Sequence, residues 1–132
     1  MKCWIHFPTT TIGWEKKEKI ENLKAVFENC SEVFIAIGDK NRQDLLFDMI
    51  DAGDDGIDVA SLAEKSSLSR PAVSHHLKVL KDAKIIEPRK VGTKIFYSVK
   101  IRVGILEKIK DLVIGVEDLV MEKEAESSKN KI

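Results

Sequence analysis

Apolar residues in the first third of the chain recur in steps of three and four, the spacing of one face of an amphipathic helix. This pattern predicts one long helix over residues 15–37, with residues 29–31 as the place where the helix could break. The apolar face of this helix consists of Ile20, Leu23, Phe27, Cys30 and Phe34. Gly38 then provides a C-terminal stop, and Asp39 provides an N-cap for a second helix. The second helix is expected to bury Leu45, Leu46, Met49 and Ile50.

Two short helices joined by a polar turn come next. Asp58 can cap a short third helix, and a fourth helix is expected over about residues 71–83. Pro71 fits the first turn of the fourth helix because it has no N–H group to leave unpaired. It also disfavours helical dihedral angles at the residue before it, so the cap is Ser69 or Arg70.

The last third of the chain predicts a hairpin and then a long helix. Two runs rich in β-branched and aromatic residues, 85–90 and 94–100, flank Val91-Gly92-Thr93 and predict a β-hairpin. A sustained apolar stripe then predicts a helix over residues 102–123. The stripe consists of Ile105, Leu106, Ile109, Leu112, Val113, Val116, Leu119 and Val120.

The order of these elements predicts a mainly α fold with a small β-hairpin wing, a winged helix-turn-helix. The length of 132 residues and the 43% hydrophobic content suit one compact domain. We assign this domain to residues 15–123, with residues 1–14 as an N-terminal arm and residues 124–132 as a polar tail that frays. Its end helices, 15–37 and 102–123, carry more apolar surface than a monomer of this size usually exposes, so both are expected to form a dimer interface.

Charge is distributed unevenly along a chain whose formal net charge is zero. Between Lys65 and Arg102, ten basic residues stand against two acidic ones, which gives this segment +8 and the remainder −8. The basic segment coincides with the predicted helix-turn-helix and hairpin. A basic module of this kind suits the phosphate backbone of nucleic acid, so double-stranded DNA is the expected partner.

The fourth helix has an apolar face and a polar, basic face when its residues are placed at about 100° intervals. Such a helix fits the major groove, where Arg70, Ser74 and His75 could reach base edges. The two lysines further along suit phosphates, and the basic hairpin tip would add salt-dependent contacts. The predicted DNA-binding residues are Ser69, Arg70, Ser74, His75, Lys78, Lys81, Arg89, Lys90, Thr93 and Lys94. His76 falls on the inner face and is expected to be a packed, hydrogen-bonded core histidine.

Four stretches of the chain resemble one family of regulators. They are residues 33–42, 59–63, 89–93 and, most specific, Leu68-Ser69-Arg70-Pro71-Ala72-Val73-Ser74-His75-His76-Leu77-Lys78-Val79-Leu80. Through them the chain strongly resembles the ArsR/SmtB family of bacterial and archaeal repressors over about residues 30–100. Two positions depart from the family pattern. Lys40 stands where the family often has proline, and Thr93 stands where the wing often has arginine.

The resemblance implies a homodimer built from the first and last helices. The expected interface residues are Ile20, Leu23, Phe27, Ile105, Ile109, Leu112 and Val116. It also implies a repressor that leaves an imperfect palindromic operator when an inducer binds.

No metal and no cofactor is expected. Many members of the family bind metals through a cysteine pair at the start of the third helix, and this chain has Asp58 and Ala60 there. Other members use ligands on the last helix that include histidine, and the last helix of this chain contains no histidine. An alternative is a metal- or thiol-responsive sensor that uses Cys3, His6 and Cys30.

The sequence also bears on two other classes of function, an enzyme and a protein-interaction module. Ser74 beside His75 has no acid to orient it and no oxyanion donors, so no enzymatic activity is expected. A winged-helix protein-interaction module without DNA binding is the second alternative. No signal peptide or membrane span is predicted, and the two cysteines are not closely spaced, so a soluble cytoplasmic protein is expected.

Overall fold

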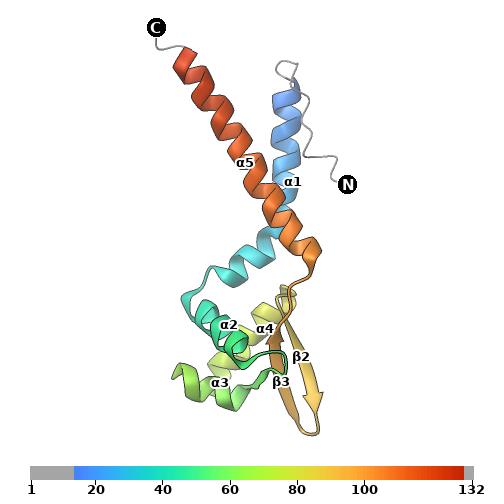
Figure 1. Cartoon of the computed structure of the whole chain (residues 1–132), viewed down its shortest axis with the longest axis vertical. Helices are drawn as coiled ribbons and strands as arrows, with labels where there is room; N and C mark the ends of the chain where they lie inside the picture. The colour runs from blue at the N-terminus through green and yellow to red at the C-terminus, as the bar shows by residue number, and fades with distance from the viewer. Residues whose placement is uncertain (1–13, 130–132) are drawn as a thin grey trace. The chain divides into compact units, whose positions relative to one another are not determined.

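The computed structural model describes residues 14–129 of the chain, which form two compact units (Figure 1). The winged unit comprises residues 31–103. The helical pair comprises the described residues up to Cys30 and from Gly104 onward. No helix in the described part of the chain is long and apolar enough to cross a membrane.

Five helices and three strands make up the described residues. The helices are α1 (Trp14–Ile37), α2 (Lys40–Ala52), α3 (Val59–Ser66), α4 (Arg70–Asp82) and α5 (Val103–Lys129). The strands are β1 (Ile57–Asp58), β2 (Ile86–Val91) and β3 (Lys94–Val99). This order confirms the mainly helical winged fold that the sequence predicts.

The winged unit closes a continuous apolar core. Its side chains that are less than 2% exposed come from the end of α1, from α2, α3 and α4, and from the segment before β2. They include Leu45, Met49, Leu62, Val73, Leu77, Leu80 and Ile85. Helices α3 and α4 thus bury the apolar faces that their helical spacing defines. The prediction for α2 is partly wrong, since Leu45 and Met49 are buried but Leu46 is half-buried and Ile50 is 58% exposed. The reason is that Leu46 and Ile50 lie about 100° or more around the helix from Leu45.

The small sheet has the order β1-β3-β2, and all of its strands are antiparallel. In the hairpin, Val91 pairs with Lys94, so Gly92 and Thr93 form the two-residue turn. Gly56, just before β1, has φ +80°, and a Cβ there would lie 2.7 Å from the carbonyl oxygen of Tyr97. Glycine is therefore required where the chain enters the sheet.

Three helices begin at side chains that cap them. The carboxylates of Asp39 and Asp58 accept hydrogen bonds from the backbone N–H groups of Arg42 and Ser61, both at 3.1 Å. The hydroxyl of Ser69 accepts from the N–H of Ala72 at 3.2 Å, which settles the cap of α4. These are the N-caps that the sequence indicates.

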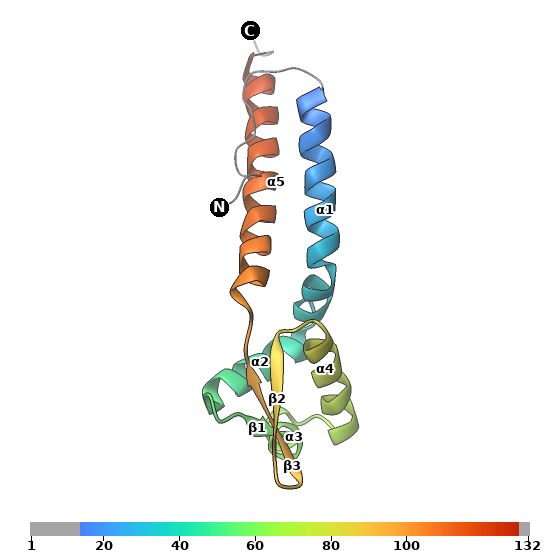
Figure 2. The same ribbon diagram turned by 90° about the vertical axis from the view of Figure 1, so that its right-hand side faces the viewer.

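In the helical pair, α1 and α5 run side by side and antiparallel (Figure 2). Cys30, Leu112 and Gly115 are buried within it. An ion pair between Lys19 and Glu122 joins the two helices near the start of α1. The pair is a compact unit of its own, which the hydrophobic pattern did not reveal.

Helix α5 is longer than the sequence predicts. It continues past Lys123 to Lys129, so residues 124–129 are helical rather than a frayed tail. The physical reason is composition, since Glu124, Ala125 and Glu126 favour helix and no proline or glycine interrupts them. Helix α1 continues through residues 29–31 without a break.

Candidate nucleic-acid interface

Helices α3 and α4 form a helix-turn-helix whose geometry is fixed by the turn between them. Ser67 ends α3 in the left-handed region, with φ 62°. The hydroxyl of Ser66 accepts from the N–H of Leu68 at 3.3 Å, which ties the turn back to α3. Leu62 on α3 and Val73 on α4 are fully buried, so α4 is held in place by packing as well as by its cap.

The outer face of α4 carries the side chains that the sequence predicts. Val73, Leu77 and Leu80 turn inward and are at most 2% exposed. The predicted residues on and beside this helix are all exposed, namely Ser69, Arg70, Ser74, His75, Lys78 and Lys81. The ammonium of Lys78 lies 3.5 Å from the carboxylate of Asp82, an exposed pair that solvent screens.

The wing presents a second basic group of residues, Arg89, Lys90, Thr93 and Lys94, all exposed. Two of them have partners within the winged unit. Arg89 donates to the carbonyl oxygen of Asp55 at 2.7 Å, and its guanidinium carbon lies 5.7 Å from the ring centre of Phe96. The ammonium of Lys94 lies 3.7 Å from the carboxylate of Asp58. Among residues 14–129, no side-chain hydrogen bond or ion pair of this kind holds Lys90 or Thr93.

Sequence reasoning missed the role of Arg42 in holding α4. The guanidinium of Arg42 donates to the carbonyl oxygens of Ala36 and Ile35, at 2.6 and 2.9 Å, and so caps the C-terminal end of α1. A third nitrogen lies 3.3 Å from Nδ1 of His76 on α4. His76 is hydrogen-bonded, as the sequence predicts, but it is half-buried rather than part of the core. Arg42 lies in the first turn of α2, and nothing in the local sequence pattern indicates that it contacts α4.

Asp58 links the helix-turn-helix to the wing electrostatically. Hydrogen bonds from Ser61 lower the pKa of the Asp58 carboxyl, and the nearby charge of Lys94 lowers it further. The carboxylate is therefore ionised at neutral pH, where it caps α3 and balances one charge of the wing.

Of the three candidate sensor residues, the structure describes only Cys30. Cys30 is 1% exposed, and burial raises the pKa of its thiol, which makes it a poor nucleophile. Cys3 and His6 lie outside the described residues. Among residues 14–129, no group of three or more His, Cys, Asp or Glu side chains is placed to hold a metal ion. The absence of a metal thus stays a prediction.

The predicted dimer residues fall into two groups. Leu23 and Leu112 turn into the helical pair, where Leu112 is buried and Leu23 packs against Gly115 of α5. The others remain accessible, with Ile20, Phe27 and Val116 exposed and Ile105 and Ile109 half-buried. The exposed apolar stripe of α5 also includes residues that the prediction left out, Leu106, Val113 and Val120. We refer to Ile20, Phe27, Leu106, Ile109, Val113, Val116 and Val120 as the apolar stripe.

The fold and the exposed basic helix define a winged helix-turn-helix regulator. Residues 57–87 match the bacterial regulatory protein, arsR family. The transcriptional repressor SdpR of Bacillus subtilis (strain 168) is 38% identical over 68 residues, which make up 52% of this chain and 72% of that protein. An uncharacterized HTH-type transcriptional regulator of Methanocaldococcus jannaschii, MJ1325, is 30% identical over 93 residues, or 70% of this chain and 97% of that protein.

A solved structure supports the same fold. An ArsR-like transcriptional regulator from Rhodococcus sp. RHA1 matches with a TM-score of 0.64 and 24% identity, over 80% of this chain and 92% of that chain. The chain belongs to the ArsR family of bacterial regulatory proteins, and it is a transcriptional regulator rather than an enzyme. The resemblance seen in the sequence is thereby confirmed.

Proposed function

We propose that the protein is a sequence-specific repressor that binds an imperfect palindromic DNA operator as a homodimer and leaves it when an inducer binds. The observation that carries this proposal is the outer face of α4. Its Arg70, Ser74 and His75 are exposed around the start of a helix whose opposite face is fully buried. A helix so held can enter the major groove without losing core contacts.

The wing extends the same basic surface. Thr93 lies in the hairpin turn and Lys94 directly follows it, whereas Arg89 and Lys90 lie on β2. Contacts from these side chains to phosphates add affinity that does not depend on base sequence, so they position α4 rather than specify the operator.

Dimerisation is supported by the apolar stripe. Val113, Val120 and Phe27 are 57%, 50% and 46% exposed, although each is a large apolar side chain. A second copy would bury them, and a two-fold axis would present two copies of α4 to successive turns of DNA. Repression is supported by the name of the Bacillus subtilis relative, a transcriptional repressor.

The test is selection of bound DNA from a random pool by the full chain, followed by titration of the selected sequence. The expected result is an imperfect palindrome with half-sites about 10 base pairs apart, bound with an affinity that falls steeply as salt rises. Failure to enrich any sequence, or an affinity that salt does not change, would instead favour a protein-interaction module.

A further inference from the structure

Arg42, on α2, contacts two other helices of the winged unit at once. Two of its guanidinium nitrogens donate to the carbonyl oxygens of Ala36 and Ile35 in the last turn of α1, at 2.6 and 2.9 Å. The third, Nη1, lies 3.3 Å from Nδ1 of His76 on α4. A guanidinium carries only donors, so Nδ1 of His76 accepts and the imidazole proton is on Nε2. One side chain thus joins the end of α1 to the DNA-reading helix.

The side chain of Arg42 is held firmly enough to act as a fixed support. Its own backbone N–H donates to the carboxylate of Asp39 at 3.1 Å, within the cap of α2. Its guanidinium is planar and rigid, so the two bonds to α1 also fix the direction of the nitrogen that faces His76. The support therefore has a defined direction as well as a defined place.

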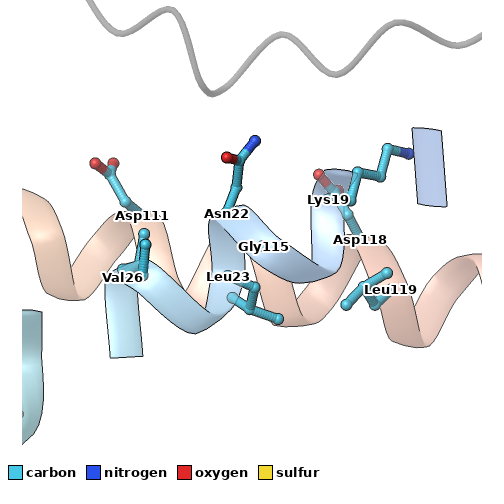
Figure 3. A pocket seen from close by; sticks show the side chains of 9 residues that line it. Lys19, Asn22, Leu23, Val26, Asp111, Gly115, Asp118 and Leu119 are labelled. Carbon is cyan, nitrogen blue, oxygen red and sulfur yellow. The ribbon is translucent and has the colours of Figure 1, made fainter. Parts of the chain in front are cut away.

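Helix α1, which supplies the two carbonyl groups, takes part in both units. Its first part belongs to the helical pair, where a Cβ on Gly115 of α5 would lie 3.1 Å from Cδ1 of Leu23 (Figure 3). Residues 31–37 belong to the winged unit. Carbonyl groups in the last turn of a helix have no partner within that helix, so Arg42 stabilises the end of α1 while it holds α4.

A directional contact at His76 sets the rotation of α4 about its own axis. The inner face of α4 packs through Val73, Leu77 and Leu80, and apolar contact is not directional. A rotation of about 15° would move a side-chain tip that lies roughly 5–6 Å from the axis by about 1.5 Å. Hydrogen bonds to base edges do not tolerate a shift of that size.

His76 is well placed to transmit this restraint to the outer face. It directly follows His75 in the chain, and the centres of the two rings lie 5.7 Å apart. His75 is exposed, whereas His76 is half-buried. Holding the second ring therefore also fixes the stretch of backbone that presents the first.

We infer that Arg42 is a positioning residue for operator recognition, whose guanidinium, anchored on the last turn of α1, sets the rotation of α4 through His76. This inference rests on the proposed function, because the rotation of α4 matters for recognition only if α4 reads DNA.

The test compares the affinity of the full chain for the selected operator with its affinity for a scrambled duplex. Arg42→Lys keeps the positive charge and loses the planar fork. It is expected to weaken operator binding about tenfold and to leave binding to the scrambled duplex within about twofold. His76→Leu should do the same, because it removes the acceptor. His76→Asn, which keeps an acceptor near the place of Nδ1, should recover most of the operator affinity.

Gln43→Ala is the matched control. The side chain of Gln43 also donates to the last turn of α1, from Nε2 to the carbonyl oxygen of Ile37 at 2.8 Å. Within residues 14–129, no hydrogen bond of this side chain reaches α4. The operator affinity of this variant should match that of the parent. The double variant of Arg42→Lys and His76→Leu should lose no more than either single variant, because both changes remove one contact.

Three outcomes would overturn the inference. Equal losses for the operator and the scrambled duplex would show that Arg42 only supports folding. Equal losses in Gln43→Ala and Arg42→Lys would assign the effect to the end of α1 rather than to α4. Additive losses in the double variant would show that the two residues act separately.

Amide chemical shifts of α4 in the free protein separate the inference from the proposed function. Arg42→Lys is expected to shift the amide signals around His76, and Gln43→Ala is expected to leave them in place. Unchanged α4 signals in Arg42→Lys would overturn the inference, even for a chain that binds its operator. A parent chain that enriches no operator would overturn the proposed function, and the shifts would then decide alone whether Arg42 holds α4.

Discussion

The winged unit and the helical pair differ in how far they bury their apolar residues. In the winged unit, Leu45, Met49 and Leu80 are fully buried. In the helical pair, Val113, Val120 and Met121 are half or more exposed, and the buried residues are few. Two antiparallel helices can bury only one face of each against the other, whereas three helices and a sheet enclose a core. The first unit therefore closes a core within one chain, although Ile35, Phe47 and Ile50 at its surface are 67%, 69% and 58% exposed. The second unit buries little and leaves its apolar stripe to a partner.

The largest expected effect comes from opening the core of the winged unit. Leu80→Ala should lower the free energy of unfolding by about 2–5 kcal/mol, because it leaves a cavity at a site that is 0% exposed. Chemical denaturation measures this loss, which should be the same at every protein concentration. Val113→Ala is the matched change in the helical pair, and its effect should appear only at concentrations at which the dimer forms. Equal and concentration-independent losses in both variants would remove the contrast between the units.

A charge in the apolar stripe should separate the proposed dimer without unfolding the winged unit. Val113→Glu or Val116→Glu is expected to weaken dimerisation about a hundredfold or more, because each interface would bury unpaired carboxylates. Sedimentation velocity measures the change, with Lys110→Glu as the control at an exposed position of α5 outside the stripe. If both stripe variants remain dimeric, the stripe is not the interface.

Removal of a helix cap in the winged unit is expected to have a smaller effect on stability. Asp58→Ala should cost about 1 kcal/mol of stability at pH 7, because α3 loses the acceptor for the N–H of Ser61. The pKa of Asp58 is lowered in the folded state, so its ionic contribution is complete above the unfolded pKa of about 3.9. That contribution is lost as the pH falls through the lower, folded value. Asp58→Asn should keep most of the cap and lose this dependence of stability on acid. If the stability of the parent and of the Asn variant changes with pH in the same way, the assignment is refuted.

The smallest expected effect is that of a single lysine of the wing. Lys90→Ala should weaken binding to all DNA sequences alike and reduce the slope of log affinity against log salt by about one unit. Titrations of the selected operator and of a scrambled duplex at several salt concentrations measure both quantities. Lys94→Ala is expected to reduce the slope less, since its ammonium already lies near Asp58. A slope that neither variant changes would remove the wing from the DNA interface.

Local signals in the sequence predicted the winged unit well. Asp39, Asp58 and Ser69 cap the helices that follow them, and the spacing of Val73, Leu77 and Leu80 gives the inner face of α4. Caps and helix faces depend on residues close together in the chain, so a single sequence contains the information they need.

The remaining features depend on contacts between distant segments. A helical stripe shows that Leu112 and Val116 lie near one face of α5, but not that α1 covers the first and leaves the second exposed. In the same way, no local pattern connects Arg42 with His76, or Arg89 with Asp55. Tertiary packing decides which side of a helix contacts its neighbour, and the periodicity of one helix does not predict that side.

The most direct test of the central claim is the affinity of Arg70→Ala and His75→Ala for the selected operator, measured by fluorescence anisotropy beside the parent chain. Each variant is expected to lose about 1–3 kcal/mol of specific binding, because one base contact is removed from the outer face of α4. Their thermal unfolding should match that of the parent, since both side chains are exposed. Parent-like affinity in both variants would contradict the assignment of this face of α4 to DNA.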